Sequence, residues 1–137
     1  MPRGDLDSAL PEVLLGAGSL SVDDIERVAR RSAVPALAEG ALERVATGAA
    51  YADAVAATRP IYGRSTGVGA NRMVAVSDPQ AQALRLLRSH ATSAGPLRHP
   101  ERVRAMLTVR LNQLAAAGNG IAPEGVEALA AMADADA

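Results

Sequence analysis

The sequence predicts a mainly α-helical fold with one short extended segment and a glycine-rich loop at residues 61–72. Three observations support this fold class. Apolar residues recur at helical spacing in several segments, residues suited to begin a helix precede those segments, and three glycines fall between positions 63 and 69. At 137 residues the chain has the size of one domain, which can bury a core without disulfides or metals.

Composition limits what that core can contain. The chain has no Phe, no Trp and two Tyr, so Leu, Val, Ile, Met and Ala must fill the interior. Because burial stabilises by roughly 25 cal/mol per Å² of apolar surface, small alanine side chains contribute little each. Alanine-rich helices therefore depend on neighbouring elements, and we expect a partner.

Charge and residue content disfavour several classes of function. A formal net charge of −1 argues against a polyanion-binding protein as a whole. The absence of cysteine removes disulfides, thiolate nucleophiles and Cys-type zinc sites, and two histidines with scattered carboxylates have no metal-ligand spacing. We expect no metal. The chain starts without a basic and apolar leader, and no apolar stretch approaches the ~20 residues of a membrane span, so the expected compartment is the cytoplasm.

The first elements are predicted from their boundary residues. Residues 1–18 mix Pro, Gly and charge, and we interpret them as a flexible lead-in to a folded domain over 19–137. Ser21 is predicted to cap a helix, because its side-chain oxygen can accept from an exposed backbone N–H. Asp23 and Asp24 complement the positive end of that helix.

A second helix is predicted from Pro35, whose fixed φ suits a first helical position. It extends towards Val55, with Gly48 as a point at which it could divide. Pro60 ends it, because proline disfavours helical geometry at the residue before it. We expect Ile61 and Tyr62 to form a short extended piece that leads into the loop.

Three further helices follow the loop. Asp78 is predicted to cap the third helix, which ends near Gly95 and carries His90 in its last turns. Pro100 opens a long helix with an apolar stripe that closes around Gly118. Pro123 opens a final, alanine-rich helix with no capping residue at its end.

Tyr62 beside the loop and His90 near a helix end form the one candidate site that the residues indicate. To act as a base near neutral pH, a tyrosine needs neighbouring cations or hydrogen-bond donors that stabilise the phenolate. The adjacent glycines permit loop motion over a substrate. Structural roles stay open, because a tyrosine at a strand edge usually buries its ring and a lone helical histidine is more often a hydrogen-bonding residue.

Two other functions are weaker interpretations. The loop lacks the Gly-Lys-Ser/Thr ending of a phosphate-binding P-loop and does not match the dinucleotide Gly-x-Gly-x-x-Gly pattern. Nucleic-acid binding is suggested by a group of arginines on two predicted helices, but stacking aromatic residues are missing. The group comprises Arg85, Arg88, Arg98, Arg102, Arg104 and Arg110.

Several motifs in unbroken order carry a resemblance to a known family. Residues 62–69 read Tyr-Gly-Arg-Ser-Thr-Gly-Val-Gly, and residues 86–91 read Leu-Leu-Arg-Ser-His-Ala, with Gly-Pro-Leu at 95–97. Residues 103–107, 110–115 and 118–121 read Val-Arg-Ala-Met-Leu, Arg-Leu-Asn-Gln-Leu-Ala and Gly-Asn-Gly-Ile. This order resembles the N-terminal segment of the histidine and aromatic amino-acid ammonia-lyases and aminomutases, which use a methylidene-imidazolone (MIO) cofactor.

The resemblance implies the N-terminal domain of the aromatic amino-acid lyase fold and a role for each matching residue. Tyr62 matches the family tyrosine that removes the substrate β-proton, and His90 matches a histidine that lines the substrate pocket. The Ser89–His90 pair is more similar to histidine lyases and bacterial tyrosine aminomutases than to plant phenylalanine lyases. The mobile lid loop of the family corresponds to Gly63, Ser65, Thr66, Gly67 and Gly69.

The sequence also departs from the family pattern. Val68 replaces a phenylalanine of the loop, and Ala83 and Arg85 replace a Gln and an Asn. The Ala-Ser-Gly tripeptide that cyclises to MIO occurs nowhere in the chain. The MIO is therefore expected on a partner chain.

We accordingly interpret the chain as the small subunit of a two-chain lyase, a hetero-oligomer that is inactive without its second subunit. An aminomutase subunit and a noncatalytic regulatory or scaffold partner of a complete lyase are the alternatives.

Overall fold

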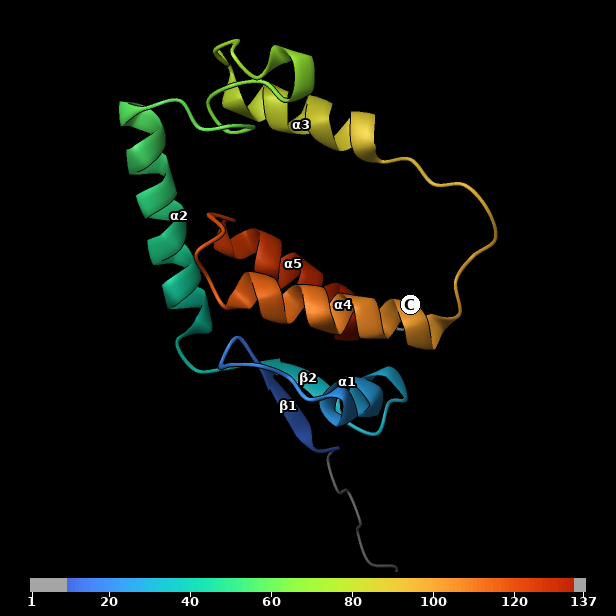
Figure 1. Cartoon of the computed structure of the whole chain (residues 1–137). Coiled ribbons are helices and arrows are strands. Elements are labelled where there is room, and N and C mark those ends of the chain that lie inside the picture. Colours follow the sequence, from blue (N-terminus) through green and yellow to red (C-terminus); the bar gives the residue numbers. More distant parts are fainter. Residues whose placement is uncertain (1–9, 135–137) are drawn as a thin grey trace, which may run out of the picture. The chain divides into compact units, whose positions relative to one another are not determined.

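The computed structural model describes residues 10–134 and confirms the mainly α-helical fold (Figure 1). In chain order the elements are β1 (Glu12–Leu15), α1 (Val22–Ala29), β2 (Val34–Leu37), α2 (Ala41–Thr58), the 3₁₀ helix η1 (Gly69–Asn71), α3 (Pro79–His90), α4 (Pro100–Ala115) and α5 (Pro123–Asp134). The chain divides into two compact units. We name them the core unit, which comprises residues 10–49 and 98–134 of the described chain, and the loop unit, Ala50–Leu97.

A pair of parallel strands corrects the prediction for the start of the chain. β1 pairs with β2 in a register that joins Glu12 to Val34 and Leu15 to Leu37. Val13 and Leu15 are buried, so the flexible lead-in predicted over 1–18 is wrong for this part. Four residues are too short a run for the alternation of a strand to be recognised in a sequence. The prediction for residues 1–9 lies outside the described residues.

Pro35 lies in β2 rather than at the start of a helix, so the second helix was predicted too early. In the described structure β2 has one neighbouring strand, and Pro35 stands opposite Val13 in it. An edge strand tolerates proline because the missing N–H faces away from the ladder. The helix begins at Ala41 and continues without a break through Gly48 to Thr58, before the predicted stop at Pro60.

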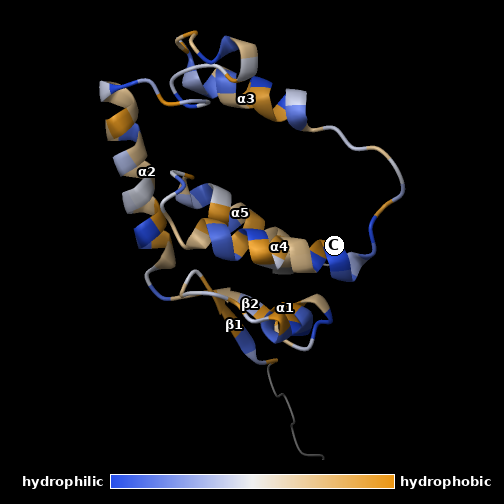
Figure 2. Cartoon of the chain, viewed as in Figure 1, coloured by the Kyte–Doolittle hydropathy of each residue, from blue (hydrophilic) through white to orange (hydrophobic). Residues whose placement is uncertain are grey.

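The core of the described residues lies where the strand pair, α1, α4 and α5 meet (Figure 2). Its largest fully buried side chains are Leu15, Leu111, Val45, Val126 and Thr108. The Thr108 hydroxyl donates to the Arg104 carbonyl oxygen at 2.8 Å, which satisfies this buried polar group. The core therefore consists of aliphatic and small side chains, as the absence of Phe and Trp requires.

One side chain joins the exit of β1 to α4. The Asn112 carboxamide oxygen accepts from the Gly16 amide at 2.7 Å, and its nitrogen donates to the Gly18 carbonyl at 3.0 Å. Gly16 has φ +82°, and a Cβ there would lie 2.8 Å from the Ala115 Cβ. Only glycine fits so close to the helix in this conformation.

The helix starts predicted from capping residues are confirmed. The Ser21 hydroxyl accepts from the Asp24 amide at 3.1 Å, and the Asp24 carboxylate accepts from the Ser21 amide at 3.0 Å, which completes a capping box. The Ser21 hydroxyl also donates to the Asp24 carboxylate at 2.7 Å, and this bond, the bond from the Ser21 amide and a further one from Arg27 lower the pKa of Asp24. Asp78 likewise accepts from the Ala81 amide at 3.0 Å and begins α3.

Candidate functional site: the tyrosine loop and helix α3

The glycine-rich loop of the loop unit begins with a tight turn at Ile61. The Ile61 carbonyl oxygen accepts from the amides of Arg64, Ser65 and Thr66 at 3.1, 3.0 and 3.2 Å. The Ile61 amide donates to the Ser65 hydroxyl at 2.8 Å. Tyr62 consequently lies within a turn, and the short extended piece predicted at Ile61 and Tyr62 is wrong. The reason is that the hydroxyl of Ser65 and three backbone amides close the chain on itself.

Extended pairing occurs further along the loop, in an antiparallel bridge between Thr66 and Ala75. The Gly67 amide donates to the Val74 carbonyl at 3.0 Å, and the Val76 amide donates to the Ser65 carbonyl at 2.9 Å. The bridge closes the residues between 67 and 74 into a lobe that contains η1. Its backbone shape is thus set by hydrogen bonds rather than by apolar packing.

Two of the glycines are required by this geometry. A Cβ at Gly67 would lie 2.6 Å from the Asn71 carbonyl oxygen, which is closer than real contacts allow. Gly63 has φ +73°, in the left-handed region that favours glycine. The glycines of the motif therefore permit the turn and the close approach of two backbone segments.

An ion pair ties the turn to α2 within the loop unit. The Arg64 guanidinium donates from Nε to the Asp53 carboxylate at 3.1 Å and from Nη2 to the same oxygen at 2.5 Å. The two residues are 11 positions apart, and their pairing was not predicted from the sequence. Both side chains are partly or largely exposed, so the pair positions the turn at a modest gain in stability.

The Tyr62 side chain is 65% exposed, and its hydroxyl is held within the loop. The phenolic oxygen accepts from the Gly69 amide at 3.1 Å. The structure therefore does not show the buried ring that a purely structural tyrosine would have. One hydrogen bond orients the oxygen and leaves its own proton able to bond elsewhere.

His90 is the last residue of α3, and its Nδ1 lies 2.9 Å from the Leu86 carbonyl oxygen. The Ser89 hydroxyl donates to the same carbonyl at 2.9 Å and also lies 2.9 Å from Nδ1 of His90. With the proton on Nδ1, the ring donates to Leu86 and its Nε2 becomes an acceptor. Both side chains are exposed at the end of the helix.

The structure brings the start of the loop close to His90. A hollow of about 590 Å³, which we name the histidine hollow, is lined by the residues Gly63, Ala83, Leu86, Leu87, His90 and Ala91. Its lining is apolar apart from the imidazole, which suits an aromatic or imidazole ring. Gly63 is the neighbour of Tyr62, although Tyr62 itself does not line the hollow.

Ser89 faces a different space. It lines a second hollow of about 470 Å³, the polar hollow, between loop residues from Gly67 to Ser77 and the residues Gln82, Arg85, Leu86 and Ser89 of α3. Ser89 and His90 therefore line different hollows, although the Ser89 hydroxyl lies 2.9 Å from Nδ1 of His90. Arg85 and Leu86 were not among the predicted site residues, although Arg85 was noted as a departure from the family pattern.

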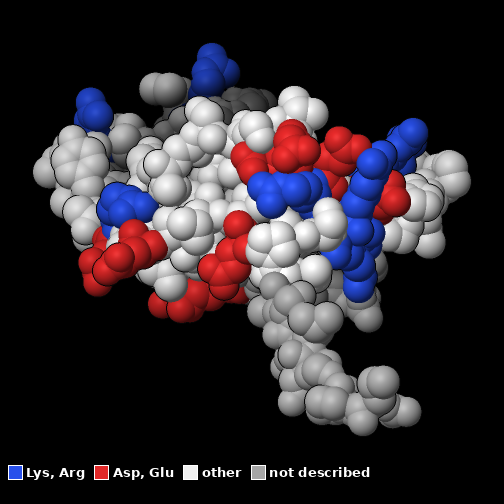
Figure 3. Space-filling view, turned by 90° about the horizontal axis from the view of Figure 1, so that it is seen from below, with Lys and Arg blue, Asp and Glu red and all other residues white. Residues whose placement is uncertain are grey.

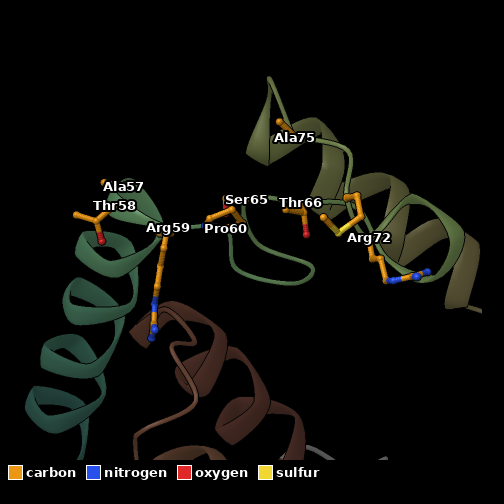
Figure 4. A pocket seen from close by; sticks show the side chains of 10 residues that line it. Ala57, Thr58, Arg59, Pro60, Ser65, Thr66, Arg72 and Ala75 are labelled. Atoms are coloured by element: carbon orange, nitrogen blue, oxygen red, sulfur yellow. The ribbon is translucent and has the colours of Figure 1, made fainter.

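A third hollow of about 360 Å³ lies between the end of α2 and the loop (Figure 4). Its lining includes Ser65 and Thr66 together with Arg59 and Arg72. In Figure 4 the two guanidinium groups point in different directions, so they do not converge on one anion. Thr66 is buried, and its hydroxyl donates to the carbonyls of Ile61 at 3.5 Å and of Gly67 at 3.2 Å, which indicates a structural role.

The arginines grouped in the sequence are divided between the two units. Arg85 and Arg88 belong to the loop unit, whereas the other four belong to the core unit. Arg104 donates from Nε to the Ala29 carbonyl at 2.8 Å and so joins α4 to the end of α1. The face seen in Figure 3 has basic and acidic side chains next to one another.

None of the described helices is long and apolar enough to cross a membrane. Within residues 10–134 no three His, Cys, Asp or Glu side chains are grouped so that they could hold a metal ion.

Comparisons with known proteins identify a family of related sequences. Residues 20–137 match the family model named aromatic amino acid lyase. The chain is 36% identical over 126 residues to the histidine ammonia-lyase of Sorangium cellulosum, an alignment that covers 88% of this chain and 24% of that protein. It is 36% identical over 113 residues to the tyrosine ammonia-lyase of Cupriavidus metallidurans, covering 80% of this chain and 21% of that one.

A solved structure extends the comparison to three dimensions. The tyrosine aminomutase from Streptomyces globisporus superposes with a TM-score of 0.81 at 28% identity, covering 91% of this chain and 24% of that one. The chain thus spans about a quarter of the length of the relatives that it matches.

Proposed function

The chain belongs to the aromatic amino acid lyase family, and we propose that it supplies the tyrosine base and the lid loop of an ammonia-lyase acting on histidine or an aromatic amino acid. The observation that carries the proposal is the Tyr62 hydroxyl, which is exposed and oriented by the Gly69 amide. A base must present its oxygen to the substrate, and a tyrosine with a structural role would bury its ring instead.

We propose that a second chain completes the site. The chain spans about a quarter of its relatives, and its 137 residues contain no Ala-Ser-Gly from which MIO could form. The residues present therefore do not fit the cofactor itself, but they fit the substrate side of a lyase site. The partner's MIO would supply the electrophile of the reaction.

In this proposal each predicted residue has a defined task. Once it has lost its own proton, the Tyr62 oxygen accepts the proton that leaves the β-carbon of the amino acid. His90 lines the apolar histidine hollow, where its imidazole can contact the substrate ring. The turn at Gly63 and the bridge at Thr66 let the loop close over the substrate as one lobe, because the backbone between them is already paired.

An aminomutase subunit is the second candidate, and the structural similarity to a tyrosine aminomutase favours it. Such an enzyme returns ammonia to the β-carbon after its loss and uses the same base. The two reactions differ in the product, which is an unsaturated acid for a lyase and a β-amino acid for a mutase.

The test is to co-express the chain with an MIO-bearing partner and to follow ultraviolet absorption of unsaturated acid from histidine, tyrosine and phenylalanine. We expect Tyr62→Phe to lower kcat by about 10²- to 10⁴-fold, the usual contribution of a general base. Tyr51→Phe is the matched control, because Tyr51 is the other tyrosine and is 71% exposed on α2. Chromatography of the products separates a lyase from an aminomutase.

Full activity of the partner alone, unchanged by Tyr62→Phe, would contradict the catalytic proposal. That outcome would leave the chain as a noncatalytic scaffold or regulator. Activity that needs both chains and that survives Tyr62→Phe would retain the two-chain assembly but remove Tyr62 as the base.

A further inference from the structure

The polar hollow beside α3 is lined by residues to which the proposed reaction assigns no chemical step. Tyr62 and His90 do not line it, and its volume of about 470 Å³ is within the range of small-molecule sites. Leu86 lines both this hollow and the histidine hollow, so the two spaces adjoin the same turn of the helix. The polar hollow is therefore a separate space that adjoins the histidine hollow at Leu86.

Its polar side chains are rich in hydrogen-bond donors. Asn71, Ser77, Gln82, Arg85 and Ser89 line it, and each has at least one N–H or O–H group. Ser89 already donates to Leu86, and Arg85 donates from Nη2 to the Gln82 oxygen at 3.2 Å. The remaining guanidinium N–H groups of Arg85 and the amide group of Gln82 are left to bind a ligand.

The lining contains one cation and no carboxylate. The loop unit as a whole has five arginines and two aspartates over Ala50–Leu97. Both aspartates already have partners in the described structure: Asp53 pairs with Arg64, and Asp78 accepts from the Ala81 amide. Arg85 therefore has no carboxylate partner within the loop unit, so no carboxylate of this unit neutralises the cation of the hollow.

We propose that the polar hollow binds the carboxylate of a small organic acid, with Arg85 as its cation. A guanidinium binds a carboxylate through two parallel N–H groups, which a neutral ligand cannot match. The other polar side chains supply neutral donors around the same group. The volume exceeds that of a carboxylate alone, so the body of the acid fits there too.

The binding test uses the full 137-residue chain without a partner, so its outcome does not depend on the proposed reaction. ¹⁵N-labelled protein is titrated with trans-cinnamate and, separately, with the neutral cinnamamide, and the arginine Nε–H signals are followed. We expect cinnamate to shift the Arg85 signal and to bind about tenfold or more tightly than cinnamamide.

Three variants assign the effect to the side chain. Arg85→Gln is expected to weaken cinnamate binding about tenfold or more, and Arg85→Lys to restore part of it, because lysine keeps the charge but lacks the planar fork. Arg88→Gln is the matched control, since Arg88 lies on the same helix and lines none of the hollows described above. Circular dichroism checks that the helix content is unchanged.

Equal binding of cinnamate and cinnamamide, unchanged binding to Arg85→Gln, or a dissociation constant for cinnamate above about 10 mM would overturn the proposal. Where binding depends on Arg85, the co-expressed complex identifies the source of the acid. A higher KM of Arg85→Gln at constant kcat identifies the amino-acid substrate, and an unchanged KM identifies a separate organic acid.

Discussion

The core unit and the loop unit are stabilised by different interactions. Every buried hydrophobic side chain of the described residues belongs to the core unit, in which the strand pair, α1, α4 and α5 pack together. Within Ala50–Leu97 only Thr66 and Gly67 are buried. The loop unit instead relies on the amides that converge on Ile61, the Thr66–Ala75 bridge and the Arg64–Asp53 pair. Segments with little buried apolar surface open most easily, and the proposed lid belongs to such a segment.

The largest expected effect is the loss of a core leucine. Leu111 is 1% exposed, so Leu111→Ala should lower the free energy of unfolding by about 2–5 kcal/mol through lost burial and a cavity. Leu87→Ala is the control in the loop unit, where the side chain is 68% exposed, and should change stability by less than about 1 kcal/mol. Urea denaturation measures both, and equal losses would contradict the contrast between the units.

The next effect should be confined to the loop unit. Gly67→Ala places a Cβ 2.6 Å from the Asn71 carbonyl oxygen, so the lobe closed by the Thr66–Ala75 bridge must open. We expect faster amide hydrogen exchange at Gly67 and Val76, whose bonds form the bridge, and unchanged exchange in α4. Gly18→Ala is the control, because nothing lies within 4 Å of a Cβ there.

A smaller effect is expected at the cap of α1. Ser21→Ala should cost the core unit about 1 kcal/mol, since it removes the acceptor for the Asp24 amide. The pKa of Asp24 is lowered on folding, mainly by the Ser21 hydroxyl. The stabilisation from its charge is therefore fully present above 3.8, the usual pKa of an aspartate, and is lost as pH falls through the lower folded pKa. Unfolding curves from pH 7 to 2 should show wild type and Asp24→Asn converging at the acid end.

The smallest effect should come from the ion pair on the turn. Arg64→Gln is expected to change the free energy of unfolding by less than about 1 kcal/mol, because exposed pairs contribute little. Exchange of the Ser65 and Thr66 amides, which bond to Ile61, should nevertheless rise. A loss of several kcal/mol would show that the loop unit contributes more to global stability than its exposed surface indicates.

The helix starts could be predicted from their capping residues, whereas the strand pair could not be predicted from local residues. Ser21 and Asp78 act through the backbone N–H groups next to them, so the sequence contains the whole interaction. β1 and β2 are four residues long each and are separated in the sequence by α1. Their stability comes from pairing with one another. The fixed φ of Pro35 suited a helix start and an edge strand equally, and tertiary pairing decided between them.

The candidate site was predictable in its residues but not in its grouping. Tyr62 and His90 were identified from their motifs, and their assigned roles stay predictions. Ser89 and His90 contact one another but line different hollows, which fits the rotation of about 100° between consecutive residues of a helix. The turn around the Ile61 carbonyl could not be predicted, because every residue type has the same backbone oxygen.

The contacts of Asn112 with Gly16 and Gly18 have a consequence for the order of folding. They join residues more than 90 positions apart, so the exit of β1 gains this support only after α4 has been synthesised. The loop unit is thus an insertion between the two segments of the core unit, and the ends of this insertion must come together when the core unit folds. Closure entropy grows with the logarithm of length, so halving this insertion would change the closing cost by only about 0.6 kcal/mol. Chains with longer or shorter inserts between the same ends should thus retain nearly the same core.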